Sequence, residues 1–205
     1  MNLRGKDPIN LIIAGVGGQG NILLSRLIGQ GLVEKGYQVT IGETYGASQR
    51  GGSVASHVRI SMECLFSPVT PEGDADIILG LEPLESLRLL ALYGSPATFV
   101  ISNIRPVYPM AVVLGEAEYP SLNRIRDLIG ELSCEAWYLD ASRIAIGLGN
   151  PVLTNIVMTG ALLGTGLLPL EKEVLVSQLR DIFPDTKLAL NLEAFTQGVR
   201  ETQKA

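Results

Sequence analysis

The amino-acid sequence predicts an α/β protein with a three-layer α/β/α arrangement, a predominantly parallel Rossmann-like sheet and a helical C-terminal segment. Three observations support this prediction. A short apolar run near the start breaks into glycines before a helical pattern begins. Apolar runs of strand length then alternate with helical patterns as far as about residue 149, and from Asn150 onward the patterns are helical only. Strands that alternate with helices are typical of parallel sheets covered on both faces.

The first strand and helix are the clearest elements. Residues 9–14 form a continuous apolar run, as expected for a central strand that is buried on both faces. A helix follows over 19–35, where Leu24, Leu27, Ile28 and Gly31 share one face. We expect Gly31 to let this helix approach the sheet closely.

The remaining elements follow from the same patterns and from their end signals. Pro83 lies in the first turn of one expected helix and Gly94 ends it. Prolines 106, 109 and 120 mark an irregular connection. Further strands are expected at 37–42, within 43–61, at 75–81, 97–102 and 136–140. Further helices are expected at 83–93, from Ser121, and at 151–165, 170–183 and 187–203.

Length and composition bound the organisation of the chain. With 205 residues, we expect a single domain over 1–205, with a strand-rich part at 1–149 and a helical part at 150–205. Lys and Arg number 16 and Asp and Glu number 21, a formal net charge of −5 without a basic run, which argues against nucleic acid as a partner. No segment resembles a signal peptide or a membrane span, so we expect a cytoplasmic protein.

Small residues mark one face of the expected helix at 151–165. Gly160, Ala161 and Gly164 lie on one side and allow another backbone to come close. Two interpretations stay open: packing against the chain's own sheet, which we favour, or contact with another subunit.

The glycine run is the first candidate binding site. Gly15, Gly17 and Gly20 match the G-x-G-x-x-G dinucleotide fingerprint between a strand and a helix. Glycines let the chain approach a phosphate, and the N–H groups at a helix N-terminus attract an anion. The same turn could also bind nothing and serve packing only. The candidate residues are Gly15, Gly17, Gly18, Gln19, Gly20 and Asn21.

A second candidate segment precedes the alternating strand. It offers hydroxyl, amide and guanidinium groups beside two glycines, a combination suited to anionic or carbonyl groups. The alternative is an ordered surface loop held by its own hydrogen bonds. Since the ends of the first two strands lie at one edge of a parallel sheet, both glycine segments could face one cleft. The residues are Ser48, Gln49, Arg50, Gly51, Gly52 and Ser53.

Other reactive side chains are few. Glu43 stands where an NAD-linked dehydrogenase holds the ribose, which keeps that function open. His57 shares a strand face with Arg59 and is the only histidine, and a mid-strand histidine is more often buried than catalytic. Cys64 and Cys134 are too few to hold a four-cysteine cluster. We assign no catalytic residue and no metal ligand.

Taken together, the motifs resemble a known family. The matching segments are Gly15 to Gly20, Ser48 to Val54 with Ser56 to Arg59, Asp76 to Leu87, and Asn191 to Phe195. With these segments the chain resembles the γ-type component of the 2-oxoacid:ferredoxin oxidoreductases, most closely the subunit β group of the indolepyruvate:ferredoxin oxidoreductases. The resemblance covers nearly the whole chain.

The resemblance implies a subunit that is inactive alone. It implies a larger α subunit that carries thiamine diphosphate and iron–sulfur clusters, ferredoxin as the electron acceptor, and CoA as co-substrate in the oxidative decarboxylation of an aryl 2-oxoacid. This chain would bind no cofactor by itself, complete the active-site cleft and contact CoA or a phosphate, with Arg50 as the main anion contact. An NAD(P)-binding dehydrogenase and a non-catalytic CoA- or nucleotide-binding module remain the alternatives.

Overall fold

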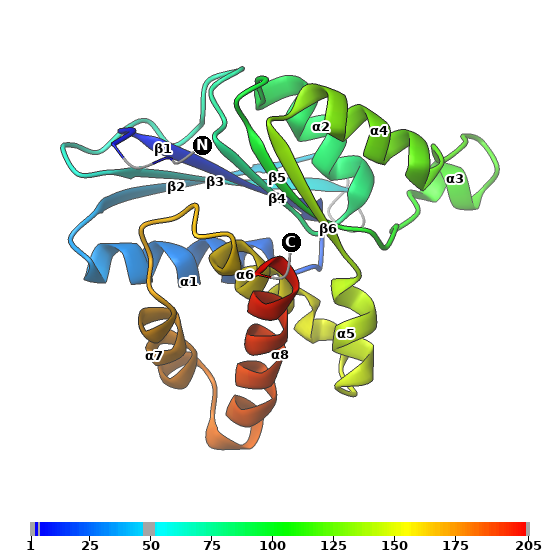
Figure 1. The fold of residues 1–205 in the computed structure, drawn as a ribbon. Coiled ribbons are helices and arrows are strands. Elements are labelled where there is room, and N and C mark those ends of the chain that lie inside the picture. Colours follow the sequence, from blue (N-terminus) through cyan, green and yellow to red (C-terminus); the bar gives the residue numbers. More distant parts are fainter. Residues whose placement is uncertain (1–2, 4, 47–51, 204–205) are drawn as a thin grey trace.

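The protein was analysed as a computed structural model, which describes residues 3, 5–46 and 52–203. Strands and helices follow each other along the chain (Figure 1). The strands are β1 (Ile9–Val16), β2 (Gln38–Tyr45), β3 (Ser53–Ser61), β4 (Ile77–Gly80), β5 (Phe99–Asn103) and β6 (Glu135–Leu139). The helices are α1 (Asn21–Glu34), α2 (Pro83–Tyr93), α3 (Met110–Val113), α4 (Leu122–Leu132), α5 (Ala141–Gly147), the short 3₁₀ helix η1 (Pro151–Leu153), α6 (Thr154–Gly164), α7 (Lys172–Ile182) and α8 (Asp185–Gln203).

The strands form one sheet in the order β2-β3-β1-β4-β5-β6. Strands β1, β4, β5 and β6 are parallel, whereas β3 runs antiparallel to both β1 and β2. The predicted α/β fold with a mostly parallel sheet is therefore confirmed. Because β1 and β2 both oppose β3, they point the same way, and their C-terminal ends lie at the same edge of the sheet, as expected.

Helices cover both faces of this sheet. In Figure 1, α2 and α4 lie on one face, and α1 with α5 to α8 lie on the other. Leu11 and Ile13 of β1 pack into the core beneath α1, while Ile12 and Ala14 pack into the core beneath α2. Burial on both faces explains the continuous apolar run of β1. The helices that follow β1 and β4 lie on opposite faces of the sheet, so the crevice between these two strands is a topological switch point.

Several elements differ from the prediction. Strand β2 continues to Tyr45 because it pairs with β3 as far as Val54. The irregular connection contains the short helix α3, and α5 follows β6 directly, with Asp140 Oδ1 accepting a hydrogen bond from Arg143 N at its start. Helices of four and seven residues span one or two turns, too few for an apolar periodicity to be recognised.

We expected Gly31 to allow the close approach of α1 to the sheet, but in the structure Gly29 does so. An added Cβ on Gly29 would lie 2.9 Å from Ile41 Cδ1 of β2, whereas one on Gly31 would lie 3.2 Å from Leu170 Cδ1 and 3.3 Å from Val174 Cγ1. Gly31 therefore faces the first turn of α7 and Leu170, which precedes that helix. The prediction was wrong because helical spacing gives the buried face of α1 but not the elements that cover it.

The small residues of α6 pack against α8. An added Cβ on Gly160 would lie 2.0 Å from Phe195 O, and one on Gly198 would lie 1.9 Å from Val157 O. Packing within the chain was the favoured interpretation, but the neighbour is a helix and not the sheet. In the part of the chain that the structure describes, no helix is long and apolar enough to cross a membrane.

Candidate functional site at the C-terminal edge of the sheet

The glycine run forms the turn between β1 and α1. Gly18 and Gly20 adopt φ angles of +102° and +90°, which L side chains rarely adopt. Gly20 is the N-cap of α1 and offers no side chain to accept from the first N–H groups, and no acidic residue lies in the first turn. These N–H groups and the positive end of the helix dipole are therefore available to an anion.

Two side chains of the run fold back onto the turn. Gln19 Oε1 accepts a hydrogen bond from Val16 N (2.9 Å), and Gln19 Nε2 donates to Leu81 O (3.2 Å), which joins the ends of β1 and β4. The buried Asn21 donates from Nδ2 to Ile13 O (3.1 Å) and Val54 O (3.3 Å). An added Cβ on Gly15 would lie 2.8 Å from Asn21 Oδ1. The conformation of the turn is therefore stabilised by the hydrogen bonds of Gln19 and Asn21 and by the space that Gly15 leaves for these side chains.

The two predicted glycine segments meet at this edge. Gly17 N donates to Gly52 O (2.9 Å), and Ser53 Oγ donates to Glu85 Oε2 of α2 (2.5 Å). Ser48, Gln49, Arg50 and Gly51 lie outside the described residues. A cavity of about 330 Å³ lies on this side of the turn, between Gly17, Gly18, Tyr45 and Val54.

A larger cavity, of about 520 Å³, opens on the other side of the turn. It lies at the C-terminal ends of β1, β4, β5 and β6, beside the switch point. Gly18, Gln19 and Gly20 form one wall, the segment after β5 a second, and the starts of α5, η1 and α6 a third. Its apolar lining is Leu23, Leu81, Pro106, Val107, Ile146, Pro151 and Val152, and its polar lining includes Arg105, Ser142, Thr154 and Asn155.

The polar groups of the larger cavity are mostly hydrogen-bond donors. Asn155 is 4% exposed, its Oδ1 accepts from Ile156 N (2.7 Å), and its Nδ2 makes no hydrogen bond to the described residues. An added Cβ on Gly20 would lie 2.3 Å from this Nδ2 atom, which places the amide beside the start of α1. Arg105 adds a guanidinium group, and Ser142 Oγ accepts from Asn103 Nδ2 (3.1 Å), which leaves its own proton available. The cavity therefore suits a ligand with an anionic part and an apolar part.

Glu82 holds the wall formed by the segment after β5. Its Oε1 accepts hydrogen bonds from Tyr119 Oη (2.5 Å) and Val107 N (3.3 Å), and its Oε2 caps α2 by accepting from Glu85 N (2.8 Å). Burial raises the pKa of the Glu82 carboxyl, which the three hydrogen bonds partly oppose. Burial and the bond to Glu82 raise the pKa of Tyr119 far above its usual range. The carboxylate thus caps α2 and also anchors residues 104–119.

His57 is a buried strand residue. Its side chain is inaccessible, its Nδ1 accepts from Thr70 N (3.4 Å), and its ring packs edge to face on Tyr93 at 5.0 Å. Burial, and then the positive charge of Arg59, lower the pKa of the imidazole. His57 lines neither cavity described above, so it contributes no acid or base to them.

Glu43, the residue that kept the dehydrogenase alternative open, is engaged within the sheet. Its Oε1 accepts from Ser25 Oγ of α1 (3.0 Å), and its Oε2 accepts from Ser56 Oγ of β3. Both carboxylate oxygens therefore bind neighbouring serines, which argues against a role in holding a ribose.

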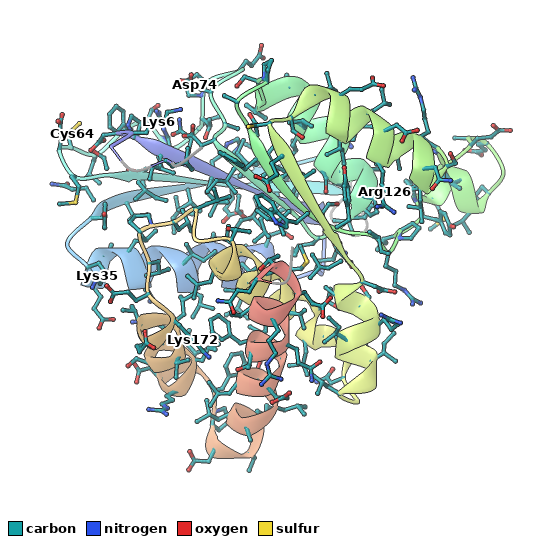
Figure 2. All side chains as sticks on the ribbon, viewed as in Figure 1. Lys6, Lys35, Cys64, Asp74, Arg126 and Lys172 are labelled. Carbon is teal, nitrogen blue, oxygen red and sulfur yellow. The ribbon has the colours of Figure 1, made fainter. Side chains whose placement is uncertain are left out.

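The two cysteines are exposed, and Cys64 lies at the periphery of the molecule (Figure 2). Among residues 3, 5–46 and 52–203, no group of three His, Cys, Asp or Glu side chains is arranged to hold a metal ion. The described residues therefore offer no ligand set for an iron–sulfur cluster.

Sequence reasoning missed Arg105, Ser142 and Asn155. Each follows a strand or begins a helix, as ligand-binding residues of parallel sheets do, and this position is the one signal that could have indicated them. Their convergence depends on how the segment after β5 and the start of α6 fold over the edge of the sheet.

Comparisons with known proteins agree on one family. Residues 10–201 match the family model described as "Pyruvate ferredoxin/flavodoxin oxidoreductase". The chain is 38% identical over 196 residues to the indolepyruvate oxidoreductase subunit IorB of Pyrococcus horikoshii. This alignment covers 95% of this chain and 96% of that protein.

Two solved structures share the fold. The γ subunit of a keto/oxoacid ferredoxin oxidoreductase from Geobacter sulfurreducens matches with a TM-score of 0.68 and 21% identity, over 96% of this chain and 99% of that chain. A 2-oxoglutarate:ferredoxin oxidoreductase from Magnetococcus marinus, solved with 2-oxoglutarate, coenzyme A and succinyl-CoA bound, matches with a TM-score of 0.75 and 24% identity. That match covers 98% of this chain but 32% of the other.

Proposed function

The chain belongs to the pyruvate ferredoxin/flavodoxin oxidoreductase family, and we propose that it is the small subunit of a cytoplasmic 2-oxoacid:ferredoxin oxidoreductase. In this proposal a larger subunit carries thiamine diphosphate and the iron–sulfur clusters, and ferredoxin accepts the electrons. The complex decarboxylates an aryl 2-oxoacid oxidatively and forms its acyl-CoA. The small subunit has no turnover by itself. The indolepyruvate-type relative, at 38% identity over almost its whole length, supports an aryl substrate.

The observation that carries the proposal for this chain is the larger cavity at the α1 N-terminus. Unpaired helix N–H groups, the free Asn155 amide and the Arg105 guanidinium suit phosphate or another anionic group. The apolar wall around Leu81, Val107 and Val152 suits a less polar chain. CoA combines both, with phosphates at one end and a pantetheine arm that leads to the thiol. We therefore propose that this cavity takes part of CoA when the complex is assembled.

The chain's own residues would bind and orient the ligand. Gly18 and Gly20 let it approach the backbone, Asn155 and Arg105 bind its anionic part, and Glu82 holds the wall that carries Val107. Thiamine diphosphate supplies the carbanion chemistry at the partner subunit. The predicted contacts of Ser48, Gln49, Arg50 and Gly51, which lie outside the described residues, remain part of this proposal.

The test is coexpression of the chain with the larger subunit, followed by purification and assay of 2-oxoacid-dependent ferredoxin reduction. Indolepyruvate, phenylpyruvate, pyruvate and 2-oxoglutarate serve as substrates, each with and without CoA. We expect a stable complex, activity with the aryl oxoacids, and none with either subunit alone. Activity of the isolated chain, or oxidation of an oxoacid with NAD by that chain, would contradict the proposal.

Arg105→Ala tests the cavity within the assembled complex. We expect the KM for CoA to rise about tenfold with little change in kcat, since a contact made equally in ground and transition states is lost. Arg143→Ala is the matched control, because Arg143 lies nearby with its side chain 84% exposed and does not line the cavity. Equal KM values in the two variants would remove CoA from this cavity while leaving the subunit assignment intact.

A further inference from the structure

Residues 104–119, here called the arm, connect β5 to the region before α4 and project from the body of the protein (Figure 1). The arm exposes large apolar side chains around α3. Met110 is 70% exposed, Val113 67% and Leu114 63%, and Tyr108 is also exposed. We call these four residues the apolar tip. No residue of α3 is buried, and none of the four belongs to either hydrophobic core.

The apolar tip carries no charge that would keep it in water. Residues 106–115 contain no charged side chain, and Glu116 and Glu118 follow on the exposed C-terminal side. A concentrated apolar patch on a projecting segment is typical of a binding surface. Basic residues, which attach apolar segments to anionic membranes, are missing from the tip. One basic residue, Arg105, precedes it at the larger cavity, and two acidic residues, Glu116 and Glu118, follow it. A protein surface is therefore the better match than a lipid surface.

The arm is held in place although no residue of its tip belongs to either hydrophobic core. Leu114 N donates to Met110 O (2.9 Å) and Glu116 N to Ala111 O (2.8 Å), which closes the α3 turn. At the base, Glu82 accepts from Val107 N and Tyr119 Oη, and the Tyr108 ring packs edge to face on Tyr119 at 5.2 Å. A preformed tip loses little conformational entropy when it binds.

The position of the arm indicates where a partner would lie. Arg105, Pro106 and Val107 at its base line the larger cavity, and Tyr108 of the tip follows directly. A partner that holds the tip therefore lies beside the mouth of that cavity. In the Magnetococcus marinus enzyme, the matched part makes up 32% of a longer chain, so that chain carries further protein besides this fold.

We infer that the apolar tip is the anchor that inserts into an apolar cleft of the larger subunit, an inference that rests on the proposed function. Burial of Met110, Val113 and Leu114 in that cleft would supply the binding energy, and the base of the arm would bring the cavity to the partner's active site. A few well-packed, buried side chains usually carry most of the binding energy of such an interface.

The experiment measures binding of the purified chain to the separately produced larger subunit by biolayer interferometry. Met110→Asp and Leu114→Asp change the tip, and Leu65→Asp is the matched control, because Leu65 is 65% exposed on the loop after β3. We expect at least tenfold weaker binding for each tip variant and a change of less than twofold for the control. Thermal unfolding of the free variants should match the wild type, since the tip packs on neither core.

The outcomes separate the inference from the proposed function. If the wild-type chain binds the larger subunit and the tip variants bind equally well, the inference fails and the subunit assignment stands. If the wild type does not bind, both fail. A wild-type dimer that the tip variants convert to monomers without weaker binding to the larger subunit would assign the tip to a second copy and overturn the inference. Binding to anionic vesicles that the tip variants lose, with subunit binding retained, would overturn it in favour of a membrane.

Discussion

Two regions, the α6–α8 pair and the turn between β1 and α1, contain glycines in close contact with other residues, but the atoms around these glycines differ. Between the helices, the missing Cβ atoms of Gly160 and Gly198 would lie 1.9–2.0 Å from backbone carbonyl oxygens of the facing helix. At the turn, the missing Cβ atoms of Gly15 and Gly20 would meet side-chain amides of Gln19, Asn21 and Asn155. Gly18, with φ of +102°, has no atom within 4 Å of that position.

This difference in neighbouring atoms indicates that the α6–α8 glycines serve stability and the turn glycines serve the cavity. Backbone atoms of two packed helices cannot move independently, so the α6–α8 glycines fix the fold. Amide side chains can rotate, and the open space beside Gly18 is available to a ligand. We therefore expect substitutions between the helices to act on the free energy of unfolding, and substitutions at the turn to act mainly on the cavity.

The largest effect is expected for Gly198→Ala. Its Cβ would lie 1.9 Å from Val157 O and 2.9 Å from Ala161 N, so α6 and α8 must separate. The free energy of unfolding should fall by at least about 3 kcal/mol, near the upper end for overpacking. Urea unfolding of the isolated chain measures it. A loss below 1 kcal/mol would show that the helices move apart easily and that the α6–α8 glycines are no more constrained than those of the turn.

Gly20→Ala should cost less stability and affect the cavity more. A φ of +90° costs an L residue about 1–2 kcal/mol, and the new Cβ displaces Asn155 Nδ2. We also expect weaker binding of CoA to the assembled complex, measured by calorimetry. Combining the change with Asn155→Ala should recover part of the unfolding free energy, because the contact is removed while the backbone strain stays. Strict additivity of the two changes would show that Asn155 does not oppose the new Cβ.

The pH dependence of stability shows whether water is excluded from the buried His57 side chain in the sheet, as it is from the α6–α8 contact. The pKa of His57 is lowered by burial, so the unfolded chain takes up a proton first as the pH falls below about 6.5. The stability that neutral His57 contributes is therefore fully present at pH 7 and is lost progressively as the pH falls below about 6.5. Comparing urea unfolding of the wild type and His57→Asn at pH 7 and at about pH 5 isolates this loss. Equal pH dependence in both proteins would mean that the imidazole is hydrated in the fold.

The smallest effect is expected for Gly130→Ala, and it has the opposite sign. Gly130 lies in α4, and no atom lies within 4 Å of its missing Cβ. Alanine should raise the free energy of unfolding by about 0.5–1 kcal/mol through helix propensity and a less flexible unfolded chain. This variant is the control for Gly198→Ala. Destabilisation here would show that helical glycines are sensitive in this protein for reasons other than contact.

Much of the architecture followed from local patterns in the sequence. The run at 9–14 and the helix at 83–93, with Pro83 at its start, were predicted correctly because burial on two faces and helix-end signals act on neighbouring residues. Motif order also indicated the family, which the match over residues 10–201 confirms. The common edge for the ends of β1 and β2 followed from strand direction alone.

Tertiary structure alone decided what each of these features contacts. The sequence placed Gly160 and Gly164 on one helix face, but only the fold puts α8 against them. It singled out the turn from Gly15 to Gly20, yet Asn155 and Arg105 reach the same cavity from segments 135 and 85 residues beyond Gly20. Chain separation of this size leaves no local pattern, because the contacts depend on how helices and loops fold over the edge of the sheet.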